Sequence, residues 1–174
     1  MYPVSKAQRG FTVIELMMAI IVLGVLLGLA IPSFMETIRN NRVIAHNNEF
    51  IGALNIARSE ALKRSDSVSI CASADELTCS GDTNFGTGWI LFTDPNANGT
   101  FEAPDELLQT WGAGPPDLTL NAATRSFVRF GASGTSASGL ETFNLIRNDC
   151  VGLKARRITI SVVGRISTAK VACP

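Results

Sequence analysis

Glu15 is the one charged side chain within an otherwise apolar stretch near the start of the sequence. A carboxylate next to hydrocarbon costs about 2.5–3.5 kcal/mol unless a partner neutralises it. If the chain is cut between Gly10 and Phe11, the new α-amino group of Phe11 lies one helical turn before Glu15, on the same helix or on a neighbouring one. The spacing therefore indicates a processing site, where cleavage of one peptide bond supplies the cation that Glu15 needs.

The apolar stretch is long enough to cross a membrane. As a helix, residues 11–31 extend roughly 31 Å, the thickness of the hydrocarbon core of a bilayer. Lys6 and Arg9 make the preceding segment positive, which keeps it in the cytoplasm and sends the rest of the chain across the membrane. Cleavage after residue 10 would remove both cations, so that the helix could leave the bilayer and pack with other helices. An uncleaved single-span anchor is the alternative for the apolar stretch taken alone.

Residues 10–16, Gly-Phe-Thr-Val-Ile-Glu-Leu, resemble the prepilin processing site of type IV pilins and type II secretion pseudopilins. The resemblance implies cleavage after Gly10 by a prepilin peptidase, N-methylation of Phe11, and a role of Glu15 in setting the register of each subunit in a fibre. Residues 1–10 are then a leader peptide and residues 11–34 a transmembrane and assembly helix.

Two glycines and a proline interrupt this helical stretch at four-residue spacing: Gly24, Gly28 and Pro32. These residues weaken the hydrogen-bond ladder of a helix. In assembled pili of the resembled family the matching stretch is often melted, so we expect an extensible segment here. Close packing of helices in the bilayer is the alternative, because the two glycines also form a G-x-x-x-G pattern.

The remaining chain predicts an α+β fold. Residues 35–64 continue as an amphipathic helix, whose stripe toward a sheet is predicted to hold Ile44, Asn47, Ile51, Leu54, Arg58 and Leu62. Residues 65–174 form a β-rich domain, with short β-prone runs at 67–72, 88–93, 107–111, 126–130, 142–146 and 157–161. These runs predict one antiparallel sheet, against which the helix packs.

Residues 54–64 and 88–99 resemble the H-type pseudopilins and the FimT/FimU group of minor pilins. The resemblance covers nearly the whole chain and implies the type IV pilin fold. It also implies a minor pilin that acts in pilus assembly or initiation, with other minor and major pilins and the prepilin peptidase as partners. Its location would be the inner membrane, as a single-pass protein with a periplasmic C-terminal domain, and then the fimbrium. A type II secretion pseudopilin of the H type shares every N-terminal feature and stays open as an alternative.

The four cysteines are an even number in a chain exported to an oxidising space, which predicts disulfide bonds. Three pairings are possible. We favour Cys71 with Cys79, which closes a short hairpin-like loop, and Cys150 with Cys173, which ties the C-terminal strand to the sheet. Zinc binding is disfavoured because the sequence has no C-x-x-C pair and no histidine at ligand spacing. No cofactor is expected.

Charge is unevenly distributed although the chain has a formal net charge of zero. Residues 65–124 carry nine acidic and no basic side chains, whereas residues 125–174 carry eight basic and two acidic ones. Five basic residues on or beside the last predicted strands are candidate DNA contacts: Lys154, Arg156, Arg157, Arg165 and Lys170. Some members of the resembled group bind DNA during natural transformation through Gly-Arg-x-Arg, but this sequence has Gly164-Arg165-Ile166-Ser167 and lacks the second arginine.

A weak calcium motif follows the second β-prone run. Asp94, Asn96, Asn98 and Asp105 match part of a twelve-residue calcium loop. Strands flank the loop and Pro95 constrains it, so an Asx-turn hairpin explains the same residues. Catalysis is not expected either. The single histidine, His46, stands alone on the predicted helix, the cysteines are expected to form disulfides, and the sequence has no G-x-S-x-G motif and no phosphate-binding loop.

Overall fold

The computed structural model describes residues 10–174, except for the side chain of residue 32. Most of the expected leader, with Lys6 and Arg9, lies outside the described residues. The chain divides into two compact units, residues 1–39 and residues 40–174, which are described separately.

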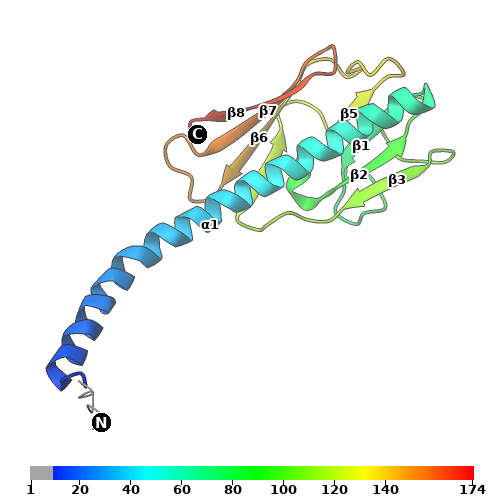
Figure 1. Cartoon of the computed structure of the whole chain (residues 1–174). Coiled ribbons are helices and arrows are strands. Elements are labelled where there is room, and N and C mark those ends of the chain that lie inside the picture. Colours follow the sequence, from blue (N-terminus) through cyan, green and yellow to red (C-terminus); the bar gives the residue numbers. More distant parts are fainter. Residues whose placement is uncertain (1–9) are drawn as a thin grey trace, which may run out of the picture. The chain divides into compact units, whose positions relative to one another are not determined.

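A single helix, α1, extends over Val13–Arg64 and contributes to both units (Figure 1). Its backbone is helical at Gly24, Gly28 and Pro32, so the expected weakening of the helix is not seen in this single chain. The resemblance assigned melting to assembled fibres and not to a single chain. The hydrogen-bond ladder on either side of these residues maintains the helix in the isolated chain.

Two antiparallel four-stranded sheets make up the β-rich part of the second unit, where the sequence predicted one sheet. The first sheet has the order β3-β2-β1-β5, with β1 at Val68–Ala72, β2 at Trp89–Thr93, β3 at Leu107–Trp111 and β5 at Phe127–Phe130. The second has the order β4-β6-β7-β8, with β4 at Leu118–Ala122, β6 at Glu141–Arg147, β7 at Ala155–Ile160 and β8 at Ile166–Val171. A short 3-10 helix, η1, covers Phe85–Thr87.

The sequence missed β4 and β8, both of which are edge strands. Every second side chain of β4 is exposed, and no side chain of β8 is fully buried. Such strands lack the concentration of apolar residues by which strands are recognised. The predicted class, one long helix on antiparallel β-structure, is confirmed.

The core of the second unit forms around Phe50 of α1. Its ring makes edge-on contacts with Phe85, Trp89 and Phe143, with ring centroids 4.8–5.6 Å apart. These aromatic partners come from η1 and from both sheets, so Phe50 joins the two sheets to the helix. The side chains of α1 buried against the sheets are Val43, His46, Asn47, Phe50, Ala53, Leu54, Ala57 and Ala61.

This buried stripe differs from the predicted one. Asn47 and Leu54 are buried as expected, but Leu62 is 50% exposed, and Ile44, Ile51 and Arg58 lie at the margin. Small residues such as Ala53 and Ala57 bring the helix backbone close to the sheets. The prediction followed the larger aliphatic residues and therefore placed the centre of the buried face beside its true position.

Candidate functional site

The start of α1 is built by Thr12 and Glu15. The Glu15 amide donates to Thr12 Oγ1 and the Thr12 amide donates to Glu15 Oε2, both at 3.3 Å. The Thr12 carbonyl accepts from the Leu16 amide at 3.2 Å, which makes Thr12 the N-cap residue. This reciprocal pair is a capping box, which sequence reasoning missed although the T-x-x-E spacing was visible.

Gly10 and Phe11 precede this cap and are exposed. The Phe11 side chain is 86% accessible, and no atom of the described residues, chain neighbours aside, lies within 4 Å of the position that a Cβ would occupy at Gly10. The bond between them is therefore open to a peptidase within the described chain. Glu15 lies at the first turn of the helix, on the same side of the cut as the new amino terminus.

The first half of α1 exposes a continuous apolar surface. Its large apolar side chains between Phe11 and Met35 are 46–86% accessible. The most apolar 18-residue window of α1 has a mean hydropathy of 2.7 and is 0% buried, and by length and composition this helix could cross a membrane. Exposed apolar surface of this extent requires a partner, which is lipid or other helices.

Two disulfides are present, Cys71–Cys79 and Cys150–Cys173, each with the Cα atoms 5.7 Å apart. This is the pairing that the sequence favoured. Cys71 is buried in a small second core with Ile90 and Phe92, on the face of the first sheet that is turned away from α1. The other disulfide joins the segment before β7 to the chain end after β8.

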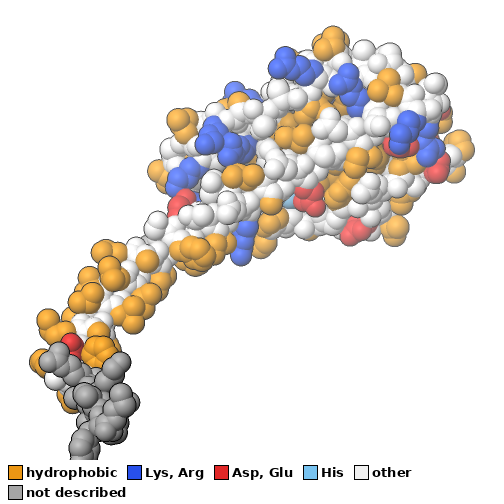
Figure 2. Space-filling view, in the orientation of Figure 1, with side chains coloured by type: hydrophobic (Ala, Val, Ile, Leu, Met, Phe, Trp, Pro, Cys, Tyr) orange, Lys and Arg blue, Asp and Glu red, His pale blue; other side chains and the backbone are white. Residues whose placement is uncertain are grey.

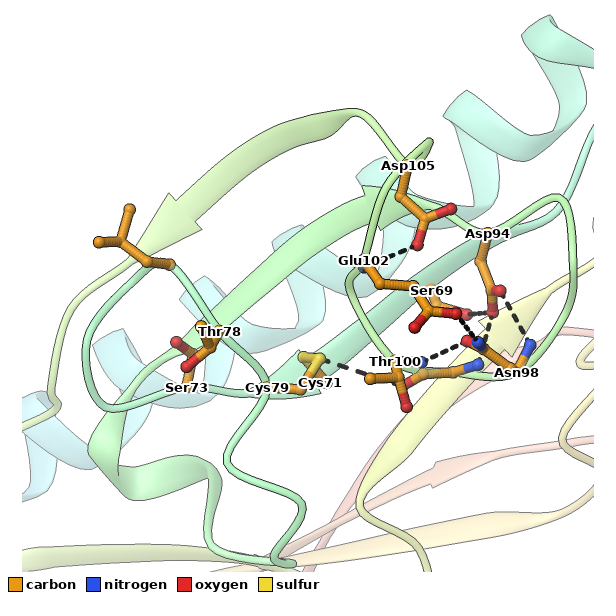
Figure 3. The surroundings of a disulfide bond; sticks show 12 residues. Ser69, Cys71, Ser73, Thr78, Cys79, Asp94, Asn98, Thr100, Glu102 and Asp105 are labelled. Atoms are coloured by element: carbon orange, nitrogen blue, oxygen red, sulfur yellow. Dashed lines mark hydrogen bonds between the residues drawn. A yellow bond between two sulfur atoms is a disulfide. The ribbon is translucent and has the colours of Figure 1, made fainter.

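Asp94 organises the loop between β2 and β3 (Figure 3). Its carboxylate is fully buried: Oδ1 accepts from the Asn98 amide at 3.0 Å, while Oδ2 accepts from the Gly99 amide at 3.0 Å and from the Ser69 hydroxyl at 2.5 Å. Asn98 in turn donates to Glu102 at 2.6 Å. The motif therefore folds as a hydrogen-bonded turn, the alternative to a calcium loop.

The side chains that matched a calcium loop do not converge. Asp105 Oδ2 accepts from the Glu102 amide at 3.1 Å, on another part of the loop from the Asp94 contacts. Over residues 10–174, no group of three or more His, Cys, Asp or Glu side chains is arranged to hold a metal ion.

The five basic residues proposed for DNA contact do not form one cluster. Arg156 and Lys170 lie directly opposite each other on β7 and β8, on the face turned toward α1. Arg157 is on the opposite face of the same sheet, where its Nε donates to Asn144 Oδ1 at 3.5 Å. Lys154 and Arg165 lie at opposite ends of β7. Adjacent residues of a strand point to opposite faces, so basic residues that are neighbours in the sequence lie on opposite faces of the sheet.

His46 is a packing residue, as expected. Its side chain is 4% exposed, its ring lies 5.5 Å from that of Trp89, and Nδ1 is 3.1 Å from Glu49 Oε2. Gly114 lies against the ring, where any Cβ would overlap it. The imidazole is therefore enclosed by the core and has no nucleophile beside it in the described structure.

An apolar N-terminal helix capped by Glu15, followed by a disulfide-bonded antiparallel β-domain, defines a type IV pilin-like protein. The family model described as "Type II transport protein GspH" matches residues 46–164, and the chain belongs to this family. The model of the prokaryotic N-terminal methylation motif matches residues 5–31. This family consists of structural, pilin-like proteins.

Solved structures and curated relatives agree with this assignment. A crystal structure of the type IV minor pilin FimU from Pseudomonas aeruginosa has a TM-score of 0.60 at 26% identity and covers 74% of this chain and 89% of that one. A second crystal form of FimU has a TM-score of 0.54 at 27% identity and covers 70% of this chain and 88% of that one. Two fimbrial proteins of P. aeruginosa are 32% identical over 103 residues, 56% of this chain and 66% of theirs. The match thus spans slightly less than two thirds of these relatives.

Proposed function

We propose that this protein is a minor pilin that contributes to the assembly or initiation of a type IV pilus, and so to twitching motility, adhesion or DNA uptake. The observation that carries the proposal is the exposed apolar half of α1 with Glu15 at its first turn. Other pilin helices would cover that apolar surface in a fibre. The likeness to FimU, over 89% of its solved chain, supports a minor pilin in particular.

Processing precedes assembly in this proposal. The precursor is inserted in the inner membrane with the β-rich unit in the periplasm, the prepilin peptidase cuts after Gly10, and Phe11 is N-methylated. The match to the N-terminal methylation motif supports these steps. The new amino group of a neighbouring subunit then pairs with Glu15, which sets the register of the two helices.

Mass spectrometry of fibres sheared from cells tests the proposal. A peptide that begins at N-methylated Phe11, enriched in the sheared fraction over the envelope, is the expected result. An intact Met1 leader in all fractions would make the chain an uncleaved anchor and overturn the proposal.

The register role of Glu15 needs a control for its role as a helix cap. Glu15→Ala removes both the carboxylate and half of the capping box, whereas Thr12→Ala weakens the cap and retains the carboxylate. We expect both variants to be processed and only Glu15→Ala to be lost from sheared fibres. Equal incorporation of the two variants would contradict the register role.

A pseudopilin of a type II secretion system is the second candidate, because the matching family model is described as a type II transport protein. Processed, methylated Phe11 peptide confined to the envelope, together with loss of protein secretion on deletion of the gene, would favour this candidate. Loss of surface fibres on deletion would favour the pilus.

A further inference from the structure

One end of the β-rich unit has exposed apolar side chains on a loop that a disulfide and a hydrogen bond hold in place. Val151 and Leu153 are 73% and 69% exposed, in the segment between β6 and β7. The Cys150–Cys173 disulfide ties this segment to the chain end, and the Cys173 amide donates to the Gly152 carbonyl at 2.8 Å. The loop is therefore fixed in a shape that presents both apolar side chains to the outside.

Unpaired cations lie beside this loop. Arg156 and Lys170 are directly opposite each other on β7 and β8, an arrangement in which like charges repel. In the described part of the chain neither side chain forms an ion pair with a carboxylate. Figure 2 shows Lys and Arg side chains next to hydrophobic ones over this part of the unit. The charge of this pair is not neutralised within the described chain, so it can attract an anionic partner.

The loop and the cations lie at the end of the unit where its helical segment begins. Thr168 of β8 donates to Asn47 of α1 at 3.1 Å, and Lys170 lies further along β8 in the direction of residue 40. At the other end of β8, the carbonyl of Val163 accepts from Arg58 at 3.4 Å, so β8 runs antiparallel to α1. The C-terminus lies at the same end of the unit as the loop (Figure 1).

The chain itself limits how far this end can be from a bilayer. The apolar side chains of the first unit continue to Met35, and the second unit begins at residue 40. Five residues extend at most about 18 Å even when fully stretched. A subunit whose first helix half is in the membrane therefore holds this end of its β-rich unit near the headgroups.

We propose that residues 150–154, with Arg156 and Lys170, rest on anionic lipid headgroups while the subunit is still in the membrane. The inference rests on the proposed function, because it concerns the membrane-inserted stage that precedes the fibre. Exposed apolar side chains next to cations are typical of surfaces that bind the interface of an anionic bilayer. The contact orients the β-rich unit on the membrane and is released when the subunit enters the fibre.

Two variants, each with one added tryptophan at one end of the β-rich unit, test the contact. Full-length Leu153→Trp is placed in vesicles of phosphatidylcholine and phosphatidylglycerol that contain lipid brominated near the headgroup, at few subunits per vesicle. Val163→Trp is the matched control, because Val163 is also exposed, at 65%, and its carbonyl accepts from the basic Arg58 at the opposite end of the unit. The native Trp89 and Trp111 contribute equally to both variants.

We expect blue-shifted emission and strong quenching for Leu153→Trp and neither for Val163→Trp. Adding Arg156→Glu and Lys170→Glu, omitting phosphatidylglycerol, or raising the salt concentration should abolish the difference. Equal quenching of the two probes, in chains that float with the vesicles, would overturn the lipid contact and leave the proposed function intact. A blue shift seen only when subunits crowd the vesicle would also overturn it, in favour of a subunit contact. Failure to float would contradict the membrane stage of the proposed function, and the lipid contact with it.

Discussion

Thr12 and Glu15 cap each other at the start of α1, each through a backbone amide 3.3 Å from the side-chain oxygen of the other. The one carboxylate of the apolar helix half is therefore engaged by its own backbone in the uncleaved chain. Cleavage before Phe11 would add a cationic amino group directly next to Thr12. The same carboxylate can then serve two purposes, as a cap within one chain and as the partner of an amine on another.

The capping box makes a prediction about the first turn of α1. Thr12→Ala should destabilise this turn by about 1 kcal/mol, because the Glu15 amide loses its acceptor. Hydrogen exchange of the amides of residues 13–16, measured for the full chain in detergent, should become several-fold faster. Thr12→Ser keeps the hydroxyl and is the control. Unchanged exchange in Thr12→Ala would show that the cap does not stabilise the helix.

Removal of the Asp94 carboxylate should destabilise the β-rich unit strongly. Asp94→Ala leaves the buried Gly99 amide and the Ser69 hydroxyl without an acceptor. We expect the free energy of unfolding, measured by thermal unfolding, to fall by about 3 kcal/mol. Asn96→Ala, in the exposed part of the same turn, should lower the free energy of unfolding by less than about 1 kcal/mol. Similar costs for the two variants would contradict a central role of Asp94.

Calcium should not stabilise this loop. Both Asp94 oxygens already accept hydrogen bonds from the protein, and Asp105 is engaged elsewhere in the loop. Addition of calcium or of a chelator should therefore leave the unfolding temperature unchanged. A rise in that temperature with calcium, reversed by the chelator, would restore the metal site as an interpretation of these residues.

Gly164 should be intolerant of a side chain because two loops meet there. A Cβ at Gly164 would overlap the Gly134 carbonyl oxygen, which also accepts from Arg58 Nε at 2.9 Å. Gly139 has a similar positive φ, +86° against +77°, but open space around it. Gly139→Ala should lower the free energy of unfolding by about 1–2 kcal/mol because of the backbone conformation alone. Gly164→Ala should lower it clearly more, because the overlap is added. Equal unfolding temperatures of the two variants would argue against the close loop contact.

Asp75 should make the stability depend on acid pH. Hydrogen bonds from the Leu77 amide, the Thr78 hydroxyl and the Thr78 amide hold the pKa of Asp75 well below its ordinary value of 3.8. A carboxyl whose pKa is lowered by folding contributes stability above its unfolded pKa, and this contribution is lost as the pH falls below that value. The difference in unfolding temperature between the native chain and Asp75→Asn should therefore be largest near neutral pH. It should shrink as the pH falls from about 5 to about 2, and a constant difference would contradict the assignment.

Local patterns in the sequence determined the apolar helix and six of the eight strands in residues 10–174, and they predict the processing segment. Glu15, the apolar run after it and the alternating strands are recognisable because each depends on residues a few positions apart. The cysteine pairing was favoured for the same reason, since Cys71–Cys79 closes a short loop and Cys150–Cys173 spans one hairpin.

Only the tertiary structure decided how the strands are shared between two sheets and which helix face they bury. Strand β5 pairs with β1 across the first sheet, while β4 and β6 on either side of it in the sequence belong to the second sheet. Phe50 became the centre of the core because Trp89 of the first sheet and Phe143 of the second meet at that point of α1. Arg156 and Arg157 point to opposite faces in any strand, but only the register of β7 turned Arg156 toward α1 and Arg157 away from it. Strand pairing joins residues far apart in the chain, and its register is set by burial on one face of the sheet, which no local pattern contains.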